Sequence, residues 1–127
     1  MTDSSSDTNA LLALLPNAAE QLAPLHAALR GPLPSDMADS QFARHGRAWA
    51  ATYVETLQQL SAYSQNMQQA DRLGDLEINL TLVAYGEYLN QLSGGLPMSQ
   101  GEIVRPADIG FTDGLPGFDG PSLKRLM

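Results

Sequence analysis

The first part of the chain alternates apolar and polar residues with the period of a helix. Its apolar positions recur at intervals of four and three, on one helix face: Leu11, Leu15, Ala18, Leu22, Leu25 and Leu29. Pro16 and Pro24 fall inside this pattern. Because proline lacks the backbone N–H and crowds the preceding turn, we predict a kink at Pro16. Gly31 ends the helix. The polar residues 1–8 are predicted to form a disordered N-terminal arm.

A second, longer helix is predicted over about residues 40 to 71, with Asp39 or Ser40 as its N-cap. Its apolar stripe comprises Phe42, Gly46, Trp49, Tyr53, Thr56, Leu60, Tyr63 and Met67, and it is widened by Val54 and Leu57. The other face is rich in glutamine, a good helix former without charge. A helix of this length is marginal alone in water, so we expect its stripe to be covered along the whole length.

A third helix is predicted over about residues 76 to 93, and it carries two apolar stripes. The first comprises Ile78, Leu82, Tyr85, Leu89 and Leu92, and the second comprises Leu76, Leu80 and Val83. Since a helix that is apolar on more than one side is usually covered on more than one side, this helix is predicted to be the central element. From Gly94 onward the periodicity is lost, and only a short last turn beginning at Pro121 is predicted.

These patterns predict an all-α fold. We expect an antiparallel bundle of three main helices, the first one kinked, with an extended C-terminal arm rich in glycine and proline. The bundle would occupy residues 9–95, and residues 96–127 would form the docking arm or a linker. A length of 127 residues fits a single domain with a modest core.

The composition narrows the range of partners and locations. The formal net charge is −7 and the pI is about 4.5, which disfavours nucleic acid and anionic membrane surfaces as partners. The chain has no cysteine, so it forms no disulfides or thiolate metal sites, and we expect a cytoplasmic location. No apolar run approaches the roughly 20 residues of a membrane span, and the start does not resemble a signal peptide.

Candidate catalytic or metal-binding groups are few. His26 and His45 have no acidic or histidine partner three or four residues away, so both are predicted to be surface residues rather than metal ligands. Glu87 is predicted to be the polar edge of its helix rather than an acid or base with a raised pKa. The glycine spacing in Gly94 to Gly101 fits no phosphate-binding motif. The sequence predicts no catalytic residue, no cofactor site and no metal site, and leaves open whether the chain is an enzyme.

Two groups of residues are candidates for docking. Arg44 and Arg47 lie in the only basic cluster and oppose the helix macrodipole there, so they either pair with Asp36 or Asp39 or contact an acidic partner or a phosphate. In the arm, the candidate docking residues are Ser99, Gln100, Glu102, Arg105 and Asp108. The aromatic residues are predicted to be core residues rather than the lining of a ligand cavity: Trp49, Tyr53, Tyr63, Tyr85 and Tyr88.

Three stretches resemble a known protein family. They are FARHGRAWAATY (Phe42 to Tyr53), YGEYLN (Tyr85 to Asn90) and GGLPMSQGEIVRPADIG (Gly94 to Gly110). They resemble the N-terminal helical extension of long acyl-CoA dehydrogenases, closest to the methylsuccinyl-CoA dehydrogenase type. The resemblance implies that a core outside these residues binds FAD and oxidises an acyl-CoA thioester with a glutamate base. No residue of this chain matches those catalytic or flavin contacts, and the family's proteins are several hundred residues long.

The sequence therefore supports a non-catalytic accessory or docking domain of an FAD-dependent acyl-CoA dehydrogenase, joined to its core in cis or in trans. The alternative is a free-standing helical interaction module or regulator, such as a homodimer. A third option is a small-molecule binder with a tyrosine-lined cavity between helices.

Overall fold

The first predicted helix is divided into three shorter helices. The computed structural model describes residues 4–127, with side chains from Asp7 onward. The three helices are α1 (Ser4–Leu12), α2 (Leu15–Gln21) and α3 (Ala23–Arg30). Each of the two breaks precedes a proline that occupies the first turn of the next helix, where its missing N–H is not needed. The predicted bend at Pro16 is confirmed, and a second break before Pro24 adds to it.

The N-terminal helix begins earlier than the periodicity indicated. α1 starts at Ser4, so residues 4–8, which we expected within a disordered arm, are helical. Residues 1–3, the rest of that predicted arm, lie outside the described residues.

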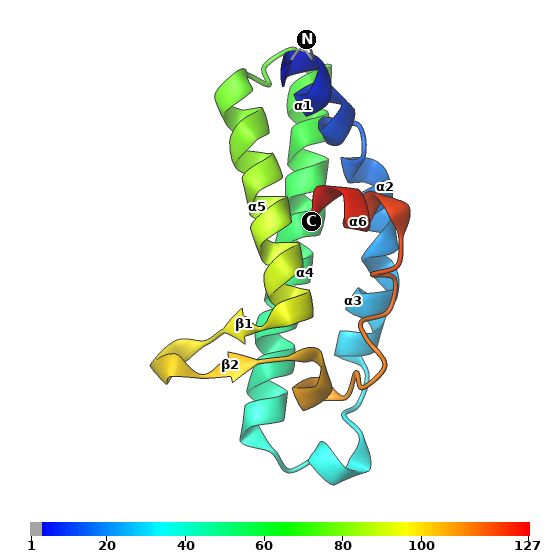
Figure 1. Cartoon of the computed structure of the whole chain (residues 1–127), viewed down its shortest axis with the longest axis vertical. Helices are drawn as coiled ribbons and strands as arrows, with labels where there is room; N and C mark the ends of the chain where they lie inside the picture. Colours follow the sequence, from blue (N-terminus) through cyan, green and yellow to red (C-terminus); the bar gives the residue numbers. More distant parts are fainter. Residues whose placement is uncertain (1–3) are drawn as a thin grey trace.

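α4 (Gln41–Gln69) is the element around which the other helices pack. The hydroxyl oxygen of Ser40 caps it by accepting a hydrogen bond from the N–H of Ala43 at 3.1 Å, as predicted. Figure 1 shows α4 between α5 (Asp75–Gly94) on one side and α2 and α3 on the other. The prediction that the third helix, α5, is the central element is therefore wrong.

The buried face of α4 also differs from the predicted stripe. It is displaced around the helix and consists mostly of small residues: Ala43, Gly46, Ala50, Val54, Leu57, Ser61 and Ser64, with Arg47 beside them. Small side chains let neighbouring backbone approach closely. A Cβ on Gly46 would lie only 2.6 Å from Cγ2 of Val104. The aromatic residues Trp49 and Tyr53 therefore lie at the edge of the core, and Tyr63 is 45% exposed.

The C-terminal segment folds back over the bundle. β1 (Leu96–Pro97) and β2 (Ile103–Val104) pair antiparallel, with Leu96 opposite Val104, and the 3-10 helix η3 (Pro106–Ile109) follows. The segment then runs to α6 (Pro121–Leu126), which packs on α2 and α5 (Figure 1). Its core residues are Leu96, Met98, Val104, Ile109, Leu123 and Leu126. The predicted last turn at Pro121 is thus a short helix, and the segment is part of the core.

The mostly helical class is confirmed, since the only sheet within the described residues is the two-stranded β1–β2 hairpin. Buried residues from the three N-terminal helices, from α4 and α5 and from the C-terminal segment form one continuous hydrophobic core. This single core fixes which side of each helix points outward.

Candidate docking surface

An uncovered apolar row runs along the outer face of α5. Leu76, Leu80 and Val83 are spaced by four and three residues, and their exposed fractions are 66%, 60% and 60%. The opposite face of the helix is buried against the bundle through Ile78, Thr81, Tyr85, Leu89 and Leu92. As predicted, α5 packs against both the long helix α4 and the first helical segment through α1, but its second predicted stripe is uncovered within the described chain. We call Leu76, Leu80 and Val83 the α5 stripe.

The α5 stripe is large enough to matter energetically. Full burial of a leucine or valine side chain contributes about 1.5–3 kcal/mol. Covering the exposed fractions of these three side chains would therefore contribute roughly 3–6 kcal/mol. Grouped apolar side chains on the surface mark interaction sites more often than scattered ones do.

The charged residues on α5 itself are all acidic, and the nearest preceding cation in the sequence is the exposed Arg72 in the turn before the helix. α5 carries Asp75, Glu77 and Glu87, and no lysine or arginine lies between Asp75 and Gly94. Asp75 and Glu77 lie in the first turn, where they stabilise the helix through its macrodipole. Glu87 lies well beyond the first turn and is exposed, so this explanation does not apply to it.

A second apolar region lies at the edge between α4 and α5. The rings of Tyr53 and Tyr88 pack at 4.4 Å between centroids. Burial raises the pKa of Tyr53, and the nearby Tyr88 raises it further. Trp49 Nε1 donates to His45 Nε2 at 3.0 Å. An open hollow of about 350 Å³ beside them is lined by His45, Ala48, Trp49, Thr52 and Tyr53. All five lie on α4, so this hollow is a shallow surface feature rather than a cavity between helices.

Among the predicted core aromatics, Tyr85 is fully buried. Its hydroxyl donates to the backbone carbonyl of Leu57 on α4. Burial raises the pKa of Tyr85 far above its ordinary value of 10. The prediction of a core position therefore holds for Tyr85, while Tyr53 and Tyr88 are only partly buried and Tyr63 is exposed.

Arg47, a predicted docking residue, points into the protein and is 9% exposed. Its Nε donates to the carbonyl of Ile109 at 3.2 Å, and its Nη1 donates to those of Ala28, Gly31 and Pro32 at 3.0, 2.9 and 3.3 Å. Its guanidinium carbon also lies 5.4 Å from the ring centre of Phe111. Burial lowers the pKa of Arg47. Arg47 thus holds the end of α3 and the C-terminal segment against α4, with its Nε and Nη1 donors occupied within the chain.

The other predicted docking residues lie near one end of the bundle. Ser99, Gln100 and Glu102 are exposed at the tip of the β1–β2 hairpin, and Arg44 is exposed on α4. The backbone N–H of Arg105 donates to Asp108 Oδ2 at 2.8 Å, so this aspartate caps η3. The structure brings these residues to the surface with the exception of Arg47, and their docking role stays a prediction.

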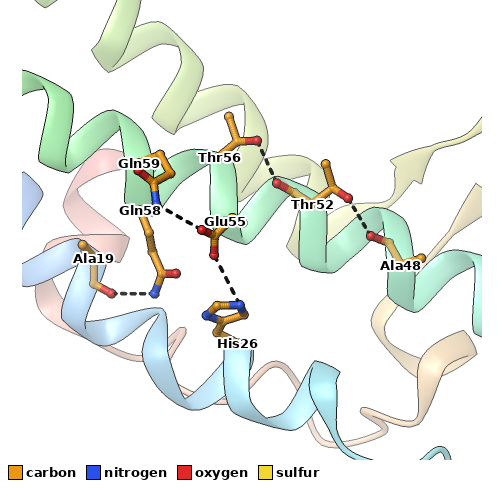
Figure 2. Close-up of polar contacts among 8 residues, drawn as sticks. All are labelled: Ala19, His26, Ala48, Thr52, Glu55, Thr56, Gln58 and Gln59. Atoms are coloured by element: carbon orange, nitrogen blue, oxygen red, sulfur yellow. Dashed lines mark hydrogen bonds and ion pairs between the residues drawn. The ribbon is translucent and has the colours of Figure 1, made fainter.

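His26 has a partner that sequence spacing did not reveal. Figure 2 shows His26 on α3 pointing toward Glu55 on α4, with Nε2 and Oε2 3.4 Å apart. Nearby, Gln58 Nε2 donates to the carbonyl of Ala19 at 3.4 Å. These contacts tie α2 and α3 to α4. Within the described residues no three histidine, aspartate or glutamate side chains are grouped to hold a metal ion.

Comparisons with known proteins complete the description. No protein-family model matches the chain. A protein named (2S)-methylsuccinyl-CoA dehydrogenase, from Cereibacter sphaeroides, is 44% identical over 89 residues, which are 70% of this chain and 16% of that relative. The resemblance noted from the sequence is thus confirmed, and the chain spans about one sixth of the length of this relative. No helix within residues 4–127 has the length and apolar character needed to cross a membrane.

Proposed function

Because this chain is related in sequence to an acyl-CoA dehydrogenase of the methylsuccinyl type, we propose that it is a non-catalytic docking domain of such an enzyme. The enzyme's core, which this chain would contact, binds FAD and oxidises the acyl-CoA thioester. That core belongs either to the same polypeptide or to a separate one, and a cytoplasmic location is proposed for both. The 44% sequence identity over 70% of the chain is the observation that supports this proposal.

The hollow beside Trp49 does not fit FAD. A flavin dinucleotide needs a deep site with donors for its pyrophosphate. The hollow beside Trp49 is open and lies on one helix. Nε and Nη1 of the buried cation Arg47 donate to backbone carbonyls of the chain itself. We therefore assign the flavin to the core, and we derive no chemical step for this chain.

A direct binding experiment tests the proposal. The purified 127-residue chain is titrated against a flavin-loaded acyl-CoA dehydrogenase core of the methylsuccinyl type, and complex formation is followed by sedimentation velocity. We expect a one-to-one complex. Absence of a complex would contradict the proposal. So would stoichiometric flavin in the isolated chain together with reduction of an electron acceptor by an acyl-CoA, because the chain would then be catalytic.

The alternative function is a free-standing interaction module or homodimeric regulator. The exposed α5 stripe favours this alternative too, since it would suit any apolar partner. Sedimentation of the chain alone separates the two functions. The docking proposal expects a monomer, and the alternative expects a dimer at micromolar concentration.

A further inference from the structure

We propose that the α5 stripe is the face that meets the dehydrogenase core, and that the core presents there an apolar surface flanked by lysine or arginine side chains. This inference rests on the proposed function. It adds which face of the chain makes the contact and which chemistry the core must offer.

The α5 stripe is held on a rigid element. Tyr85 and Leu89, on the opposite face of α5, are fully buried, and the Tyr85 hydroxyl bonds to α4. A helix anchored in this way keeps its outward side chains in a fixed register. Leu76, Leu80 and Val83 therefore form a row at positions i, i+4 and i+7, the pattern by which a helix fits an apolar groove.

The charges beside the α5 stripe indicate which kind of partner surface would be complementary to it. Glu87 follows Val83 by four positions and so continues the row toward the end of the helix. It is exposed and makes no ion pair within the described residues. With Asp75 and Glu77 at the other end, the row has carboxylates at both ends and no cation between them. The complementary surface is apolar in its centre and basic at its edge.

A second copy of this chain is a poorer occupant of the stripe. Each copy carries a formal net charge of −7, and a two-fold pairing through α5 would set one acidic helix against another. Whichever partner covers them, three aliphatic side chains fall far short of the roughly 800 Å² per partner that a stable interface of standard size buries. A small contact of this kind suits a partner that is also attracted by charge or held nearby.

The position of Met127 is compatible with such a partner. Asn90 Nδ2, on α5, donates to the carbonyl oxygen of Met127 at 2.9 Å. A core that continues the same polypeptide would therefore start beside α5. In that arrangement a short connection would raise the effective concentration of the two surfaces.

The test measures the affinity of stripe variants for the flavin-loaded core by the same titration. The double variant Leu80→Ser, Val83→Ser should weaken binding at least about tenfold, because it removes the apolar centre of the contact. Glu87→Lys should weaken binding about threefold to tenfold at low salt, and the salt dependence of the wild type should largely disappear.

Two matched controls locate the effect. Glu20→Lys makes the same charge change on α2, and Ile103→Ser removes an exposed apolar side chain from the hairpin. Both should change the dissociation constant by less than about twofold. Circular dichroism should give the same helix content and nearly the same melting temperature for all variants, because every substituted side chain is exposed.

The outcomes are distinct. If the chain binds the core but the stripe variants bind as the wild type does, this inference is wrong and the proposed function stands. If Ile103→Ser weakens binding as much as the stripe variants, the hairpin is the docking element and the inference is also wrong. If the wild type does not bind, both proposals fail. A chain dimer that Leu80→Ser, Val83→Ser dissociates would show that a second copy occupies the stripe.

Discussion

The outer face of α5 and the C-terminal segment of residues 96–127 have exchanged the burial expected of them. The helix was expected to be covered, and the segment was expected to be an extended arm. α5 has the regular apolar pattern of a core helix, yet Leu76, Leu80 and Val83 are exposed. The C-terminal segment is irregular and rich in glycine and proline, yet Leu96, Val104 and Leu123 are buried in the core.

The difference shows that regularity and burial are separate properties. A helix satisfies its own backbone hydrogen bonds, so its outer face can carry apolar side chains that stay exposed until a partner binds. An irregular segment must find hydrogen bonds elsewhere. The C-terminal segment finds them in the hairpin, in the Arg47 contact to Ile109, and in Gln21, whose Oε1 accepts from the N–H of Leu123 at 3.1 Å. Changes in the C-terminal segment are therefore expected to lower stability, and changes on the α5 stripe to lower binding.

The largest effect should come from truncating the buried C-terminal segment. Leu123→Ala should lower the free energy of unfolding by about 2–5 kcal/mol, because it leaves a cavity between α6 and the bundle. Leu80→Ala, the same change on the α5 stripe, should alter it by less than about 0.5 kcal/mol. Urea unfolding followed by circular dichroism measures both. Similar losses at the two positions would remove the distinction between the regions.

A somewhat smaller effect is expected from the two arginines of the basic cluster. Arg47→Ala should lower the free energy of unfolding by about 2–4 kcal/mol, since buried carbonyl groups lose a charged donor. Arg44→Ala removes an exposed side chain and should change it by less than about 0.5 kcal/mol. The same urea titration compares them. Equal stability of the two variants would show that the Arg47 contacts contribute nothing to holding the C-terminal segment.

The smallest effect is a dependence on alkaline pH. The pKa of Tyr85 is raised in the folded chain, so the folded state holds this proton more tightly than the unfolded state does. The contribution of the Tyr85 hydroxyl to the free energy of unfolding is therefore complete below pH 10. Above pH 10 it falls by about 1.4 kcal/mol per pH unit. Tyr85→Phe should lower the free energy of unfolding by about 1 kcal/mol at pH 7. Between pH 10 and 11 the free energy of unfolding of this variant should fall less steeply than that of the wild type. If the free energy of unfolding falls equally steeply with pH in the wild type and in the variant, Tyr85 is not the cause of the alkaline pH dependence.

The sequence was sufficient to predict the helical class, the cap at Ser40, the bend at Pro16 and the last turn at Pro121. It could not select the buried face of α4, because the aromatic row and the row of small residues share the same spacing. The close packing of the Val104 and Ile109 side chains on Gly46 favours the row of small residues. It also could not reveal contacts between distant positions, such as Arg47 with Ile109 and His26 with Glu55. Periodicity identified the α5 stripe as apolar but carried no information on what covers it.

Carbene footprinting of the chain with and without the flavin-loaded core tests the central claim most directly, because it reports which side chains the core covers. We expect labelling of Leu76, Leu80 and Val83 to fall several-fold in the complex while labelling of Ile103 at the hairpin is unchanged. Unchanged labelling of the α5 stripe in a complex that protects Ile103 would contradict it.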